Sequence, residues 1–109
     1  EFWAPSIDLS ETPDAYTLKA DLPGIKSEDV NVELHDDIVT ISGERKEERS
    51  SEKENVHVTE VSYGKFMRSV RLPISVDPDK VKAKFENGVL KVSLPKSEKV
   101  KPKKIEIEK

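Results

Sequence analysis

The chain has 109 residues, 38% of them charged, and its net charge at pH 7 is only −3. This length predicts one domain with one modest core. The near balance of charge argues against a nucleic-acid-binding protein, which would carry a clustered excess of Lys and Arg. The absence of cysteine excludes disulfides, thiolate chemistry and cysteine zinc sites, and it fits a reducing, cytoplasmic location. No apolar run approaches the ~20 residues that span a bilayer.

The first residues predict the remnant of an arm followed by an edge strand. The chain opens with Glu1 and not with methionine, so we expect residues 1–4 to be what is left of a longer N-terminal segment. Ile7 and Leu9 then alternate with polar residues and predict a short strand that can lie at a sheet edge. Residues 16–22 alternate more clearly and predict a second, half-buried strand.

Two segments predict β-hairpins of the same shape. In residues 81–94, Asn87-Gly88 favours a type I′ turn, because both central residues of that turn need positive φ. Such a two-residue loop fixes the register and puts the apolar side chains of both strands on one face. Residues 30–41 repeat the layout around Asp36-Asp37, so we expect one hairpin in each of two packed sheets. In the hairpin at 81–94, the predicted register pairs Phe85 with Leu90, Ala83 with Val92 and Val81 with Leu94.

The middle of the chain predicts a long polar loop between strands. Residues 44–55 contain no apolar side chain and are typical of a solvated loop. They lead into the β-branched segment 56–61, a candidate strand on a flexible arm; loops of this length in compact domains tend to be functional. Residues 66–72 form a further strand, with Arg68 in the same phase as the apolar residues. No stretch longer than one turn has helical periodicity, so the sequence predicts an all-β sandwich of about eight short strands.

The C-terminal residues predict a tail that carries a plug. Lysine-rich residues 96–104 are typical of a solvated linker, and Ile105 and Ile107 come after it. Two isoleucines at spacing two point the same way from an extended segment, as a plug for an apolar socket would; a chance apolar pair in a mobile tail is the alternative. The predicted organisation is residues 1–4 as the arm remnant, 5–95 as the sandwich domain with a loop and strand at 44–62, and 96–109 as the flexible tail.

Several short motifs in series resemble those of one family. Each is a weak signal alone, but together they follow the family's order over residues 3–107, and the chain is similar to the α-crystallin domain of the small heat-shock proteins of bacteria and plants. One departure is in the loop, where Val56-His57-Val58 has no aromatic residue. The matching pieces are Ala20-Asp21-Leu22-Pro23-Gly24, Ile41-Ser42-Gly43-Glu44, Tyr63-Gly64-Lys65-Phe66-Met67-Arg68 with Leu72-Pro73, Asn87-Gly88-Val89-Leu90 with Leu94-Pro95, and Ile105-Glu106-Ile107.

The resemblance implies an immunoglobulin-like sandwich and a way of assembling. Strand 56–59 would leave its own body and pair with the edge strand near Ile7 of a second subunit, which makes a strand-swapped dimer. The implied dimer interface is Ile7, Leu9, Val56, His57, Val58 and Arg68. Ile105 and Ile107 would dock into a groove, and this docking would join dimers into larger oligomers. The implied groove residues are Val30, Val32, Leu34, Val81, Ala83 and Phe85.

The implied activity is ATP-independent holding of unfolding client proteins, without cofactor or metal. An alternative of another class is an interaction domain like the co-chaperones built on the same sandwich, which lack the I-x-I tail. An enzyme is less favoured, because His35 and His57, the two histidines, have no nucleophile or metal-ligand set beside them. Arg68 is either a paired arginine at the dimer interface or a side chain that reaches the rim for solvent.

Overall fold

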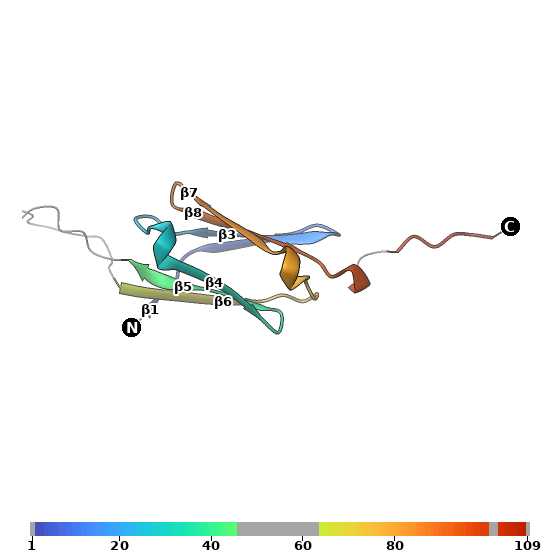
Figure 1. Ribbon diagram of the computed structural model, residues 1–109, viewed down its shortest axis with the longest axis horizontal. Coiled ribbons are helices and arrows are strands. Elements are labelled where there is room, and N and C mark those ends of the chain that lie inside the picture. Colours follow the sequence, from blue (N-terminus) through green and yellow to red (C-terminus); the bar gives the residue numbers. More distant parts are fainter. Residues whose placement is uncertain (1, 46–63, 101–102, 109) are drawn as a thin grey trace, which may run out of the picture.

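The computed structural model describes residues 2–45, 64–100 and 103–108, and within them the chain is all-β apart from three short 3₁₀ helices (Figure 1). The prediction of a β-sandwich is confirmed. The strands are β1 (Phe2–Trp3), β2 (Ile7–Glu11), β3 (Ala15–Asp21), β4 (Val30–His35), β5 (Ile38–Arg45), β6 (Gly64–Arg71), β7 (Lys82–Glu86) and β8 (Val89–Pro95). The 3₁₀ helices are η1 (Ser27–Asp29), η2 (Pro78–Lys80) and η3 (Glu98–Val100).

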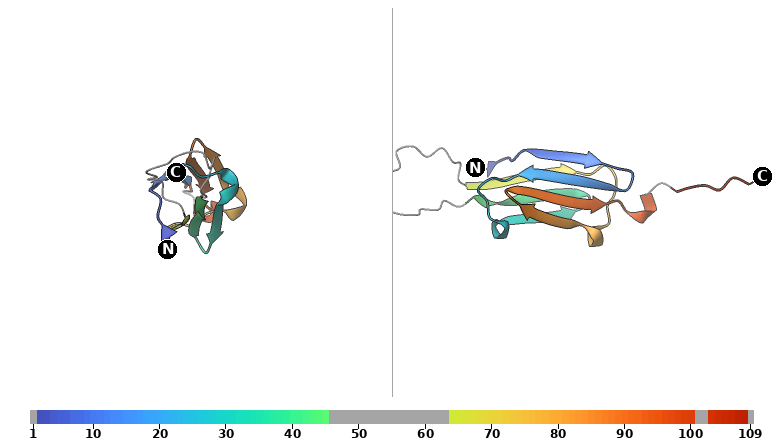
Figure 2. Two further views of the ribbon diagram at one scale, coloured as in Figure 1. Left: turned by 90° about the vertical axis from the view of Figure 1, so that its left-hand side faces the viewer. Right: turned by 90° about the horizontal axis from the view of Figure 1, so that it is seen from above.

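The described strands form two four-stranded sheets that pack face to face. One has the order β1-β6-β5-β4 and the other β2-β3-β8-β7. In the right-hand view of Figure 2, β4 (teal) and β7 (orange) lie at the same margin of the sandwich, and β2 lies at the other. Each of β4 and β7 is therefore the last strand of its sheet, and the two edges run along one side of the molecule.

Both hairpins have the predicted shape because both have the same turn chemistry. Phe85 pairs with Leu90 and Ala83 with Val92 across β7 and β8, while Leu34 pairs with Val39 across β4 and β5. Each loop is two residues long, and all four loop residues have positive φ: 49° and 63° at Asp36 and Asp37, 51° and 78° at Asn87 and Gly88. Positive φ at both positions is what a type I′ turn requires.

The core lies between the inward faces of the two sheets. Leu18, Val92 and Leu94 from one sheet and Val39, Ile41 and Phe66 from the other have no exposed surface. Because side chains alternate along a strand, each of these strands presents its polar residues to solvent. The sequence pattern of alternating residues therefore identified the inward face of each central strand.

Two details differ from the sequence prediction. The N-terminal strand is divided: β1 pairs in parallel with β6, with Trp3 opposite Phe66, while β2 pairs with β3 in the other sheet. Val81 precedes β7 instead of lying in it. The eight described strands include β1 and not the predicted strand at 56–61, which falls outside the described residues.

Gly43 of β5 occupies a position where no side chain fits. A Cβ there would overlap the carbonyl oxygen of Asp29 and lie 2.7 Å from the ζ carbon of Phe66. Overpacking of this kind costs about 1–3 kcal/mol, so we expect Gly43→Ala to lower the free energy of unfolding by at least about 1 kcal/mol. The neighbouring Ser42→Ala variant should change it by less than about 0.5 kcal/mol. Denaturant unfolding at one protein concentration measures both, and equal stability of the two variants would contradict this packing.

Candidate functional site

The margin between β4 and β7 carries apolar side chains that the fold covers only in part. We call the six residues predicted as a groove the open margin. Its members share an apolar character and a place on the inward side of an edge strand or just before it. They are Val30, Val32 and Leu34 from β4, and Val81, Ala83 and Phe85 from β7 and the residue before it.

These side chains are more exposed than the residues that pair with them on the neighbouring strand. Val92, opposite Ala83, is 0% exposed, and Leu90, opposite Phe85, is 3% exposed, whereas Ala83 is exposed and Phe85 only half-buried. On the other sheet, Val39 is buried while its partner Leu34 is half-buried. The inner strands thus complete the core, and the edge strands present an apolar strip that another segment can cover.

Within the described sheets, both edges also present backbone groups without a neighbouring strand. As β4 and β7 end their sheets, half of their backbone N–H and C=O groups point away from the neighbouring strand. An extended peptide can add to such an edge through main-chain hydrogen bonds while side chains at alternate positions enter the apolar strip. The open margin therefore has the features of a site for an extended apolar segment.

The C-terminal residues supply a segment of that kind. Residues 103–108 extend away from the sandwich (Figure 1), and Ile105 and Ile107 are 81% and 87% exposed. Such exposure is costly for isoleucine in an isolated chain, because burying one side chain is worth about 1.5–3 kcal/mol. The structure brings the six predicted groove residues to one margin, with the tail undocked.

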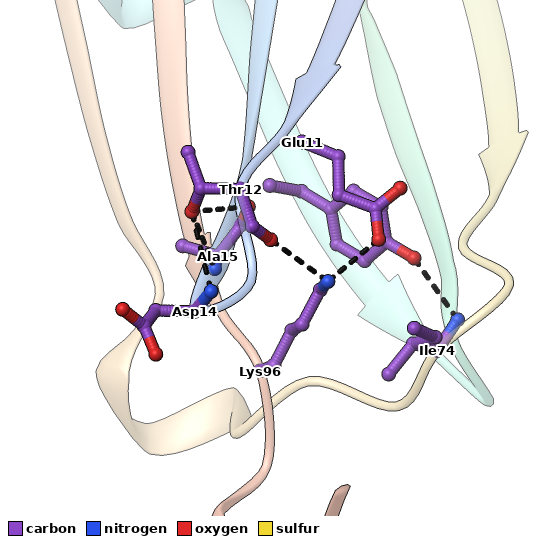
Figure 3. Close-up of polar contacts among 7 residues, drawn as sticks. Glu11, Thr12, Asp14, Ala15, Ile74 and Lys96 are labelled. Carbon is purple, nitrogen blue, oxygen red and sulfur yellow. Dashed lines mark hydrogen bonds and ion pairs between the residues drawn. The ribbon is translucent and has the colours of Figure 1, made fainter. Parts of the chain in front are cut away.

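The base of the tail is fixed to the sandwich by Lys96. Its side chain is 5% exposed, and its ammonium group donates to the Glu11 carboxylate at 2.6 Å and to the Thr12 carbonyl at 2.8 Å (Figure 3). The same nitrogen lies 5.1 Å from the centre of the buried Tyr16 ring, a cation–π distance. A buried charge is tolerated when it is paired and hydrogen-bonded in this way.

Neighbouring contacts extend this anchor. The Lys96 amide donates to the Asp14 carbonyl and the Ser97 amide to the Ser75 carbonyl. The Tyr16 hydroxyl accepts from the Ile74 amide at 3.1 Å. The chain is therefore held as far as Ser97. The prediction of a solvated linker from residue 96 onward is wrong for Lys96; a signal was present, since Lys96 is in phase with the buried Val92 and Leu94.

The residues predicted for a dimer interface are only partly described. Ile7 and Leu9 are half-buried on β2, an edge strand of its sheet. Arg68 is exposed, and its guanidinium donates to the carbonyl of Pro5 at 3.0 Å, so it fastens the connection between β1 and β2. Val56, His57 and Val58 lie outside the described residues, and the swapped strand stays a prediction.

Other candidate chemistry is sparse in the part of the chain that the structure describes. His35 lies 3.3 Å from the Asp36 carboxylate, and both side chains are largely exposed at the hairpin tip. Over the same residues, His, Asp and Glu form no group of three or more that could hold a metal ion. None of the helices found there has the length and apolar character needed to cross a membrane.

Comparisons with known proteins agree with this geometry. Residues 8–108 match the model of the Hsp20/alpha crystallin family. An 18.1 kDa class I heat shock protein of Medicago sativa is 51% identical over 109 residues, which cover 97% of this chain and 76% of that protein. Small heat shock protein C2 of Rickettsia felis is 40% identical over 94% of this chain and 67% of its own length.

This chain belongs to the Hsp20/alpha crystallin family. The solved structure of heat shock protein 16.0 from Schizosaccharomyces pombe superposes with a TM-score of 0.84 at 40% identity, covering 98% of this chain and 99% of that one. A small heat-shock protein from Xylella fastidiosa, reported with a distinct high-order structure, gives a TM-score of 0.78 at 38% identity and covers both chains fully. Membership of the family supports a chaperone role.

The Lys96 anchor yields a matched pair of variants. Lys96→Met keeps the apolar stem and removes the charge from Glu11 and the donor from Thr12, which we expect to lower the free energy of unfolding by about 1–3 kcal/mol. Lys99→Met, in the exposed helix η3, should change it by less than about 0.5 kcal/mol. Thermal or denaturant unfolding compares them; a Lys96→Met variant as stable as the parent would show that the anchor contributes nothing.

Proposed function

We propose that this chain is a cytoplasmic, ATP-independent holdase that binds unfolding proteins and prevents their aggregation. The observation that carries the proposal is the open margin, an apolar strip along two strands that form edges of the described sheets. The same chain carries an exposed Ile-x-Ile segment in its tail. Unfolding proteins expose extended apolar segments, and such segments meet both requirements of this site. Holding of this kind needs no catalytic group and no nucleotide.

The tail explains how such a site is kept covered until it is needed. Burying Ile105 and Ile107 stabilises docking by about 3–6 kcal/mol, and ordering the tail and restricting two bodies cost an amount of similar size. One docked tail is therefore weak and reversible, but several in one particle add avidity. The assembly would hold together yet exchange subunits and uncover its margins to clients.

We further propose that two chains form a strand-swapped dimer. Segment 56–59 of one chain would add to β2 of the other, beside Ile7 and Leu9. The edge position of β2 supports this pairing, because an edge strand presents unpaired backbone groups. Arg68 holds the connection that leads into β2, and in this dimer it would lie near the interface.

Holdase activity is tested by heating a labile enzyme without ATP and following turbidity. With this chain at a stoichiometric ratio we expect the turbidity to fall severalfold, because exposed apolar segments are covered before they meet one another. An equal mass of serum albumin is the control for protein added without a binding site. Turbidity that is the same with either protein would refute the proposed activity.

Assembly through the tail is tested by replacing both Ile105 and Ile107 with Ala. Each substitution removes most of the apolar surface of a docked side chain, so we expect particles above the dimer to dissociate to dimers in multi-angle light scattering. Val100→Ala, which truncates an exposed apolar residue in η3, is the control and should leave particle mass unchanged. If large particles keep their full mass in the double variant, assembly through Ile105 and Ile107 is excluded.

A further inference from the structure

The outward side chains of β7 and of the tail form two complementary charge patterns. Along β7 the solvent-facing residues are Lys82, Lys84 and Glu86, and all three are exposed. Along the tail, Lys104, Glu106 and Glu108 alternate with the two isoleucines. Strands that pair side by side place residues of like phase opposite one another. The isoleucines and the charges of the tail would therefore meet the apolar and the charged residues of β7, respectively.

Only one direction of pairing matches every position. If the tail runs antiparallel to β7 with Ile105 opposite Phe85 and Ile107 opposite Ala83, every charged pair is attractive. The three pairs are Lys104 with Glu86, Glu106 with Lys84, and Glu108 with Lys82. The parallel direction on the same centre keeps the Glu106–Lys84 pair but sets Lys104 against Lys82 and Glu108 against Glu86. Like charges directly opposite are destabilising.

The other wall of the margin does not offer this match. The outward residues of β4 are Asn31, Glu33 and His35, all exposed. With the two isoleucines opposite Val32 and Leu34, Glu106 faces Glu33 in either direction. With the isoleucines opposite Val30 and Val32, Glu106 faces the neutral Asn31, but Glu108 faces Glu33 in one direction and Asp29 in the other. Charge therefore favours the edge of β7 over that of β4.

We propose that the tail docks as an antiparallel fifth strand on β7 of a second copy of this chain, selected by the pairs of Glu106 with Lys84 and Glu108 with Lys82. This rests on the proposed docking of Ile105 and Ile107 and adds its register, its direction and its choice of partner. A chain of the same kind with lysine between its two tail isoleucines would be disfavoured at this margin. The charge pattern is thus a device for choosing which chains assemble together.

The direction of the tail along β7 and the distance that it can span together require that the docked tail come from a second copy. β8 runs antiparallel to β7 and ends at Pro95, beyond the Lys82 end of β7. A tail that folded straight back on its own body would start at that end and run parallel to β7, which is the mismatched direction. To enter from the Glu86 end it would have to travel back along the whole of β8, about 20 Å at ~3.3 Å per residue.

The tail of the same chain is too short for that path. Between Ser97, which is held by Ser75, and Lys104 there are seven steps. Three of them lie in η3 and rise ~2.0 Å each, and four can extend by ~3.3–3.6 Å, so the reach is roughly 20 Å. That leaves no length to pass from Pro95 to Ser97 or to reverse direction. A tail from another copy has no such constraint.

Peptide binding tests the charge selection. The acceptor is the full chain with Ile105→Ala and Ile107→Ala, whose own tail no longer competes, and the probe is a fluorescent peptide of residues 103–109. We expect Lys84→Glu in the acceptor, or Glu106→Lys in the peptide, to weaken binding roughly three- to thirtyfold, and the two reversals together to restore it to within about threefold. Glu33→Lys on β4 is the matched control and should leave the affinity within about twofold.

The outcomes separate this inference from the docking on which it rests. If the unchanged peptide binds and Lys84→Glu has no effect, charge selection is overturned while docking stands. If binding of the unchanged peptide responds to Glu33→Lys instead, the tail lies on β4 and the assignment to β7 is overturned. If the unchanged peptide does not bind at all, docking itself fails, and this inference fails with it.

Disulfide trapping tests direction and partner, and the absence of native cysteine makes it unambiguous. Residues directly opposite in a sheet are within the ~4.4–6.8 Å Cα separation that a disulfide needs. Chains with Lys82→Cys mixed with chains with Glu108→Cys should cross-link at least about tenfold faster than chains with Glu86→Cys mixed with the same partner, as read by mass spectrometry of the linked peptides. Faster linkage through Glu86→Cys would overturn the antiparallel direction. In one chain carrying both Lys82→Cys and Glu108→Cys, a predominantly internal disulfide would overturn the claim that the docked tail comes from a second copy.

Discussion

The structure depends on a constraint common to open sheets: an edge strand has a neighbour on one side only. In this chain both hairpins place their first strand at an edge, and the two edges fall on the same margin of the sandwich. Val92 and Val39 are completely buried, while their partners Ala83 and Leu34 keep contact with solvent. The fold thus completes its core with the second strand of each hairpin and leaves the first strand partly exposed.

Under the proposed docking, the tail and the open margin are two parts of one assembly contact. Lys96 is buried and holds the chain against the turn between β2 and β3, so that the tail departs from a fixed point. Ile105 and Ile107 then lie exposed at a distance from the core. A rigid base with an apolar end suits docking between bodies, since weak single contacts gain strength only when several act together. Under the proposed function, the same weakness would let an apolar client compete for the site.

Local chemistry explains how much of the fold the sequence could predict. Asn87-Gly88 and Asp36-Asp37 determine two-residue turns, and alternation then assigns every inward residue of both hairpins. Contacts between residues far apart in the sequence could not be predicted. The pairing of Trp3 with Phe66 joins distant residues over a two-residue strand. The partner of Lys96 is Glu11, 85 residues away, so its charge suggested solvent although its phase pointed inward. That both edges meet at one margin depends on the order of strands in each sheet, which the resemblance implied and alternation alone does not fix.

The central claim is that the open margin is covered by the tail and uncovered when the tail leaves. Hydrogen exchange measured by mass spectrometry tests it directly, by comparing the parent with the Ile105→Ala, Ile107→Ala variant under the same conditions. We predict faster exchange in the variant for the peptide over residues 82–86, whose backbone the tail would pair with, and a smaller increase over residues 30–35, whose side chains it would cover. Exchange in β3 and β8, which are paired on both sides, should not change. Identical exchange of the two edge strands in both proteins would contradict the account.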